Sequence, residues 1–194
     1  KKRGSGEVFM DWLQKISDLC RDKYGKKVMF WGDMLREHTE VYDRLPENAI
    51  PVIWGYEDLA NNMKERELQR ITSRGIKKFY VAPSTNTYQT YTGRFDTADN
   101  NLRMFAEIGE DYGAYGYLVC HWANPFGAQN IVWDYVPIAL GAQYSWKTGI
   151  RQQGGWRKQH FVRNAQQYAD EYMFGAKISA YMRELSNIYM LEPE

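Results

Sequence analysis

KVMFWGD, at Lys27–Asp33, is the stretch from which the fold of this chain can be predicted. Its apolar run, Val28–Phe30, has no polar alternation, which is typical of a parallel strand covered on both faces. The segment Trp31–Asp33 then ends the run with an aromatic ring, a flexible joint and a carboxylate. We therefore predict a buried parallel strand over Val28–Trp31 that carries functional side chains at its C-terminal end.

The same scheme recurs three times along the chain. The stretches are IPVIWGYE at Ile50–Glu57, KKFYVAPSTNTY at Lys77–Tyr88 and AYGYLVCHWAN at Ala114–Asn124. Amphipathic stretches of helical length separate them. Strands that alternate with helices and carry their chemistry at their C-terminal ends are typical of a (β/α)8 TIM barrel. We therefore predict an α/β fold of this type.

The expected elements follow from periodicity and from capping glycines. The predicted strands are Val28–Trp31, Ile50–Trp54, Lys78–Ala82 and Ala114–His121. The predicted helices are Gly6–Tyr24, Asp58–Ser73, Asp96–Tyr112, Asn130–Trp146 with a break near Pro137, Trp156–Phe174 and Ala176–Leu191. In the first helix, Val8, Phe9, Trp12, Leu13, Ile16, Leu19 and Cys20 recur at helical spacing. The polar stretch Pro83–Arg94 is too long for a tight turn and is a candidate binding loop.

Composition narrows the classes of partner. The 194 residues include 25 Lys and Arg against 24 Asp and Glu, so no net field attracts nucleic acid or an anionic membrane. No apolar run is long enough for a membrane span. Aromatic residues make up 15%, with 15 Tyr and 7 Trp, and several follow the strand patterns. Aromatic faces at a site suit sugar rings, although each ring could equally be a core residue.

Metal, cofactor and phosphate sites are not predicted. The two cysteines, Cys20 and Cys120, are far apart and fit neither a metal spacing nor a disulfide framework, and the three histidines are scattered. A glycine-rich phosphate loop is also missing from the sequence, which disfavours a nucleotide or phosphate enzyme on a similar scaffold. The expected partner is a neutral or weakly charged molecule.

Five motifs together carry a resemblance to a known family. They are FWGDM at Phe30–Met34, IPVIWGYE, FYVAPSTNTY, GAYGYLVCHW and PIALGAQYSW at Pro137–Trp146. In this order and spacing, they resemble the C-terminal half of the catalytic domain of glycoside hydrolase family 20, the β-N-acetylhexosaminidases. The resemblance spans roughly Val8 to Trp146. It implies that residues 1–150 cover about strands five to eight of a (β/α)8 barrel and that residues 151–194 are a helical extension packed on it.

The resemblance also implies a reaction. The family hydrolyses terminal β-linked N-acetylglucosamine or N-acetylgalactosamine with retention, and the 2-acetamido oxygen of the substrate is the nucleophile. An adjacent Asp-Glu pair provides the acid and orients the acetamide. That pair does not precede the first strand here, since the early acidic residues, such as Glu7 and Asp11, belong to the helix and to no such motif. We expect the pair upstream of Lys1, and we expect this chain alone to be inactive, needing the missing N-terminal barrel half or self-association.

The resemblance assigns roles to residues at the strand ends. Trp31, Trp54 and Trp122 match tryptophans that enclose the acetamide and the sugar ring, which excludes water. Tyr88 matches a tyrosine whose hydroxyl donates a hydrogen bond to the acetamide oxygen. Amino-sugar glycans are therefore the expected substrates.

Four polar positions complete the expected site. Asp33 and Glu57 match the WGD and WGYE motifs of one branch of the family, where they bind hydroxyls or shape loops; the alternative is that they are solvated surface carboxylates. Thr90 stands where many members carry an Asp or Asn, and Asn124 stands where many carry an acidic residue. Asn124 can still bind sugar hydroxyls. These departures leave open a second interpretation, a sugar-binding pseudo-enzyme without turnover on the same barrel.

Overall fold

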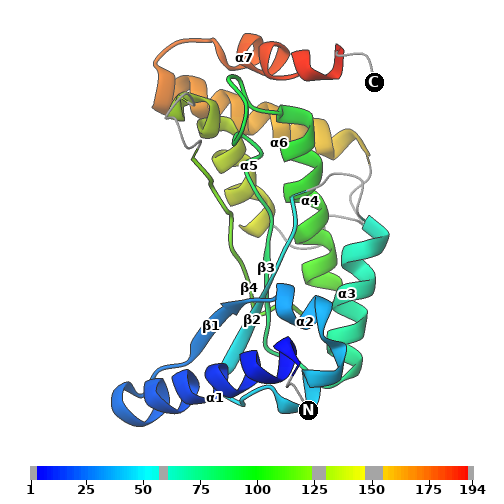
Figure 1. Cartoon of the computed structure of the whole chain (residues 1–194). Helices are drawn as coiled ribbons and strands as arrows, with labels where there is room; N and C mark the ends of the chain where they lie inside the picture. Colours follow the sequence, from blue (N-terminus) through cyan, green and yellow to red (C-terminus); the bar gives the residue numbers. More distant parts are fainter. Residues whose placement is uncertain (1–3, 57–60, 124–129, 147–154, 192–194) are drawn as a thin grey trace.

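The structure, a computed structural model, describes residues 4–56, 61–123, 130–146 and 155–191. Its four strands are β1 (Val28–Trp31), β2 (Ala49–Trp54), β3 (Tyr80–Ala82) and β4 (Gly116–Tyr117). They pair in parallel in the order β1-β2-β3-β4 (Figure 1). An α/β chain with a parallel sheet is therefore confirmed.

Helices precede, separate and follow the strands. They are α1 (Ser5–Tyr24), α2 (Asp33–Glu37), the 3-10 helix η1 (Thr39–Arg44), α3 (Asn61–Ser73), α4 (Phe95–Asp111), the 3-10 turn η2 (Ile131–Asp134), α5 (Tyr135–Trp146), α6 (Gly155–Tyr168), the π-helical turn η4 (Ala169–Phe174), α7 (Ser179–Ser186) and the 3-10 turn η5 (Ile188–Leu191). Gly25 ends α1 with a φ of 61°, a left-handed conformation that glycine adopts without steric cost.

One large apolar core lies between the helices and one face of the sheet. It joins α1, α3 and α4 to β2 and β3, and its buried members include Met10, Leu13, Ala49, Ile53, Leu68, Ile71, Phe79, Val81, Met104, Phe105 and Ile108. The opposite face carries a smaller cluster, made of Val52, Ala82 and Cys120 with Trp54, Tyr56 and Tyr80 packed against it. Because strand side chains alternate between faces, this second cluster consists of the residues that the helices do not cover.

The burial of β1 differs from the prediction. The strand was expected to be covered on both faces, but its side chains alternate, with Met29 and Trp31 exposed by 47% and 43%. Val28 and Phe30 pack on the large core instead. Among the described residues β1 pairs only with β2, and no helix covers its second face, so the prediction of two-sided burial is wrong.

β4 is shorter than the predicted Ala114–His121. Regular pairing covers only Gly116–Tyr117, followed by one isolated bridge between Ser84 and Cys120. The segment nevertheless stays beside β3, because the Cys120 N–H donates to the Pro83 carbonyl at 2.7 Å. The chain thus reaches the same sheet edge without keeping regular strand geometry.

α1 carries two apolar stripes, and only one of them is buried. Met10 and Leu13 lie in the core, whereas a second set at helical spacing is 41–60% exposed. We call this set the α1 stripe; its members are Val8, Trp12, Ile16 and Leu19. The periodicity predicted the helix correctly, but four of the expected apolar positions face away from the core.

The helix α6 and the turn η4, which follow residue 150, share a second core with α4 and α5. Buried residues of these four elements contribute to it: Phe95, Ala98, Leu102, Val136, Ala139, Leu140, Tyr144, Val162, Ala165 and Ala169. Arg183 of α7 also pairs with Asp96 of α4 at 2.9 Å. The predicted division at residue 150 stays a prediction, but these helices pack directly on α4 and α5.

Candidate functional site

Four of the expected site residues follow the C-terminal ends of the strands. Trp31 and Trp54 are the last residues of β1 and β2. Tyr88 lies in the loop after β3, and Trp122 lies beyond β4. Since the strands are parallel, these ends lie at one edge of the sheet, which is where α/β proteins build their sites.

Tyr56 brings three of these aromatic residues together. Its ring lies 5.2 Å from the ring of Trp54 and 5.8 Å from that of Tyr88, the latter nearly edge-on. The indole N–H of Trp122 donates to the Tyr56 hydroxyl at 2.7 Å. We call these four residues the aromatic group. Trp31 lies at the same sheet edge, where it pairs in register with Val52 of β2.

The Tyr56 hydroxyl keeps its proton. Burial raises the pKa of Tyr56 well above its ordinary value, and the Trp122 hydrogen bond offsets only part of that effect. Burial also raises the pKa of the neighbouring Cys120 thiol. The phenol accepts from the Trp122 indole and is also hydrogen-bonded to the Cys120 thiol, so this part of the site is polar and uncharged.

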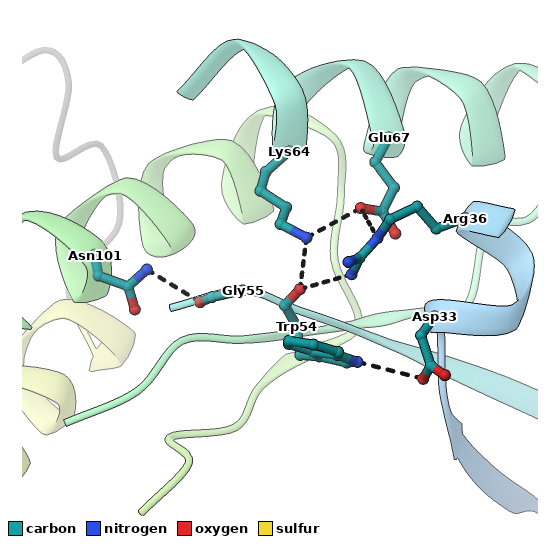
Figure 2. Close-up of polar contacts among 7 residues, drawn as sticks. All are labelled: Asp33, Arg36, Trp54, Gly55, Lys64, Glu67 and Asn101. Carbon is teal, nitrogen blue, oxygen red and sulfur yellow. Dashed lines mark hydrogen bonds and ion pairs between the residues drawn. The ribbon is translucent and has the colours of Figure 1, made fainter. Parts of the chain in front are cut away.

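Asp33 lies against Trp54 and is more than a solvated surface carboxylate. It is the first residue of α2, and its Oδ1 accepts a hydrogen bond from the Trp54 indole N–H at 3.4 Å (Figure 2). Asp33 is half-buried. The carboxylate thus fixes one edge of the indole ring.

Each of the two Trp-Gly pairs has little room for a side chain at its glycine. A Cβ on Gly32 would lie 2.7 Å from Ile53 Cδ1, and one on Gly55 would lie 2.4 Å from Lys64 Cε. Such contacts are too close for any other residue without a shift of the neighbour. The glycine in each motif therefore lets an adjacent side chain reach the strand end.

A buried charged cluster adjoins the backbone of Trp54 (Figure 2). Arg36 Nη2 and Lys64 Nζ both donate to the Trp54 carbonyl, at 3.1 and 2.7 Å. Both side chains also reach Glu67 Oε2, at 3.1 and 3.2 Å. The next carbonyl, that of Gly55, accepts from Asn101 Nδ2 at 3.0 Å. These polar side chains bind the last carbonyls of β2, where the sheet ladder ends.

The loop after β3 holds Tyr88 between two contacts. Arg94 lies over the Tyr88 ring at 5.9 Å and donates to the Tyr88 carbonyl at 3.3 Å. Asn86 and Gln89 adopt left-handed backbone conformations with φ of 55° and 54°. Such values are uncommon outside glycine and mark a backbone held by its surroundings. The predicted binding loop is therefore an ordered turn that presents Tyr88.

Thr90 stabilises this turn from within. Its Oγ1 accepts from the backbone N–H groups of Thr92 and Gly93, at 3.0 and 2.5 Å. Asp and Asn side chains commonly make the same kind of local bond. Thr90 thus fulfils a loop role that the expected acidic or amide residue could also fulfil.

A polar network lies beneath the loop. Asp134 is fully buried and accepts from Thr87 Oγ1 at 2.5 Å, and its Oδ1 lies 3.0 Å from His121 Nδ1. Thr87 in turn contacts Thr85. The network ties the loop after β3 to η2 and to the segment that carries Trp122.

Two expected site residues, Glu57 and Asn124, lie outside the described residues. The sequence patterns also missed several residues that the structure places near Trp54. Tyr56 lies two positions after Trp54, so strand alternation could have found it. No local signal marks Arg36, Lys64 and Glu67, which come from two helices.

The chain contains one adjacent Asp-Glu pair that the sequence patterns passed over, Asp170–Glu171. It lies in η4, away from the strand ends. Asp170 Oδ1 accepts from the backbone N–H groups of Ile178 and Ser179, and Oδ2 accepts from the Ser179 hydroxyl. Asp170 therefore acts as a cap for α7.

In the part of the chain that the structure describes, no group of three or more His, Cys, Asp or Glu side chains is arranged to hold a metal ion. No helix in the described segments has the length and apolarity needed to cross a membrane.

No protein-family model matches the chain, and no curated protein sequence matches it either.

Proposed function

We propose that this chain is part of a retaining, substrate-assisted β-N-acetylhexosaminidase that hydrolyses terminal β-linked N-acetylglucosamine or N-acetylgalactosamine. One observation carries the proposal: aromatic side chains from three successive strand ends, Trp54, Tyr88 and Trp122, meet around Tyr56 at the carboxyl edge of a parallel sheet. Aromatic surfaces beside protonated hydroxyls suit a sugar ring, which stacks on apolar faces and exchanges hydrogen bonds at its edge.

The sheet supports a barrel as the scaffold. Its strands follow one another in chain order, and the large core lies on one face only. Successive right-handed connections place all helices on one side of such a sheet, and in a closed barrel the other side becomes the interior. The residues on that side, Val52, Ala82 and Cys120, would line the barrel. We place the chain at about strands five to eight of a (β/α)8 barrel.

The residues of this chain would bind and orient the sugar. The indole rings would exclude water from the acetamide, and the Tyr88 hydroxyl would donate to its oxygen and hold it against the anomeric carbon. That hydrogen bond would help to stabilise the charge that develops as the ring closes. The acid that protonates the leaving oxygen would come from an Asp-Glu pair upstream of Lys1.

A second candidate is a binding protein without turnover. Thr90, where many relatives of the proposed family carry an acidic or amide residue, directs its hydroxyl to backbone N–H groups of its own loop. A site with fewer sugar ligands could still stack a sugar on its aromatic residues. Such a protein would bind N-acetylglucosamine and lack hydrolysis.

Assays on the complete polypeptide with an aryl N-acetyl-β-glucosaminide, and calorimetry with N-acetylglucosamine, test both candidates. We expect turnover, and a loss of at least about 10²-fold in kcat/KM for Trp54→Ala. Trp146→Ala is the control, because Trp146 is 90% exposed and lies at the end of α5. Binding without turnover would favour the second candidate. The absence of both binding and turnover would overturn the proposal.

A further inference from the structure

We propose that Arg36, Lys64 and Glu67 are positioning residues that hold the indole ring of Trp54 in place for a ligand. The identity of that ligand, an amino sugar, rests on the proposed function, whereas the positioning of the ring rests on geometry alone. The three side chains come from α2 and α3 and converge on the end of β2 (Figure 2).

The Trp54 carbonyl lacks a strand partner on the β1 side. Carbonyls of alternate residues in a strand point to the same neighbour, and the Val52 carbonyl accepts from the Gly32 N–H of the β1 segment at 2.9 Å. The Trp54 carbonyl points the same way, but the chain has turned into α2 at Asp33. A buried carbonyl needs a donor, and Arg36 and Lys64 replace the strand.

Glu67 holds the two cations. Its Oε2 accepts from Arg36 Nε and from Lys64 Nζ, so each long side chain is bound both to this carboxylate and to the Trp54 carbonyl. Glu67 and Lys64 are almost fully buried, with exposures of 4% and 5%. Two attachment points for each cation remove the rotational freedom that such side chains normally have.

The same cations touch the ring. The Arg36 guanidinium lies 4.9 Å from the centroid of Trp54, and the Lys64 ammonium lies 5.6 Å from it. Both distances are within the range of cation–π attraction. At the edge of the ring, the indole N–H donates to Asp33. The ring is thus held at its face, its edge and its backbone.

Stability alone does not account for this cluster. Buried ion pairs can often be replaced by apolar side chains of similar volume without loss of stability, because desolvation offsets their attraction. Apolar replacements would, however, provide neither donors to the Trp54 carbonyl nor cations beside the ring. The charged cluster therefore fixes the position of the Trp54 ring. That position determines the contact of Trp54 with Tyr56 in the aromatic group.

Two variants of the complete polypeptide separate positioning from stability. Lys64→Met removes one donor but leaves a buried carboxylate with one partner fewer. Lys64→Met combined with Glu67→Met removes the carboxylate as well, which we expect to restore stability without restoring the donor. The control is Glu107→Gln, which breaks the pair between Glu107 and Arg103 on α4.

Fluorine NMR of protein labelled with 5-fluorotryptophan reports the ring directly, and Trp54→Phe identifies its signal. We expect the Trp54 signal to shift in both Lys64 variants and to stay in place in the control. We also expect kcat/KM for the aryl N-acetyl-β-glucosaminide to fall about tenfold or more in both variants, as misplaced binding groups do.

The outcomes distinguish the two proposals. An unmoved Trp54 signal in both Lys64 variants overturns the positioning role. A signal that moves in the single variant and returns in the double variant overturns it too, since the cluster then acts only through stability. If the signal moves in both variants but the parent protein neither binds nor hydrolyses amino sugars, the positioning role stands and the proposed function fails.

Discussion

The indole N–H of Trp122 donates a 2.7 Å hydrogen bond to the hydroxyl of Tyr56, although 66 positions separate the two residues in the chain. The ring of Tyr56 also contacts Trp54 and Tyr88. One tyrosine therefore connects the ends of β2, β3 and β4. Its removal should affect the site without affecting the sheet.

Tyr56→Phe should weaken the binding of N-acetylglucosamine about two- to tenfold, because one hydrogen bond contributes about 0.5–1.5 kcal/mol. The ring contacts with Trp54 and Tyr88 remain in this variant, so the fold should be unchanged. Isothermal titration calorimetry on the complete polypeptide measures the effect. Tyr115→Phe is the matched control, since Tyr115 is 59% exposed and precedes β4 at the other edge of the sheet. Equal affinity in both variants would contradict a role for the Tyr56 hydroxyl.

Tyr88→Phe should lower kcat about 10²–10³-fold and change substrate binding far less, since one preorganised donor acts mainly on the charge that develops during the reaction. Steady-state kinetics with an aryl N-acetyl-β-glucosaminide separates the two effects. Tyr91→Phe is the control from the same loop, because Tyr91 is 80% exposed. An unchanged kcat would remove Tyr88 from the mechanism.

Lys64→Met should destabilise the fold by about 3–5 kcal/mol, because it leaves the buried Glu67 carboxylate with less compensation. Adding Glu67→Met should recover most of that loss, since the charge that then remains is the Arg36 guanidinium, whose side chain is 34% exposed and still donates to the Trp54 carbonyl. Urea unfolding of the parent and of both variants measures the free energies. If Lys64→Met proves as stable as the parent, the loss of Lys64 does not leave the Glu67 carboxylate uncompensated.

Stability should fall as the pH rises above about 10. Burial raises the pKa of Tyr56, Tyr117 and Tyr144 in the folded chain above the ordinary value of 10.0. Above that value the unfolded state loses protons that the folded state keeps, so ionisation favours unfolding. Each such group contributes up to about 1.4 kcal/mol per pH unit, until the pH passes its folded-state pKa. Urea unfolding from about pH 8 to pH 11 measures the free energy of unfolding, and tyrosinate absorbance reports the ionisation of the tyrosines. A free energy of unfolding that stays constant above about pH 10 would contradict the prediction.

The first two strands and the aromatic residues at their ends could be predicted from local pattern. The predicted and observed bounds of the first strand coincide at Val28–Trp31, and the second differs by one residue at its start. Short apolar runs that end in Trp-Gly are local signals of a strand end, and the structure leaves little room for a side chain at either glycine. The break before α5 was also expected, and the helix begins at Tyr135, two positions before Pro137.

The contacts between elements could not be predicted in this way. A helical period identifies α1 but does not say which of its two apolar stripes is buried, since Leu13 and Trp12 both recur at helical spacing. Burial of β1 depends on which faces other elements cover, and its run of three apolar residues carries no such information. The cluster of Arg36, Lys64 and Glu67 forms only when α2 and α3 meet at the end of β2.

Residues 1–194 alone should associate in solution and should show no glycosidase activity. The α1 stripe is exposed, and β1 exposes Met29 and Trp31 on the face away from the large core and has one edge unpaired among the described residues. Exposed apolar side chains and an open strand edge favour pairing with another chain. Multi-angle light scattering should therefore report species larger than 22.8 kDa. Trp12→Lys with Ile16→Glu should shift the chain toward the monomer, whereas Leu191→Lys, at an exposed position in η5, should not. A parent chain that stays monomeric at high concentration would show that the α1 stripe and β1 need no partner. Glycosidase turnover by that monomer would contradict the placement of the catalytic pair outside the chain.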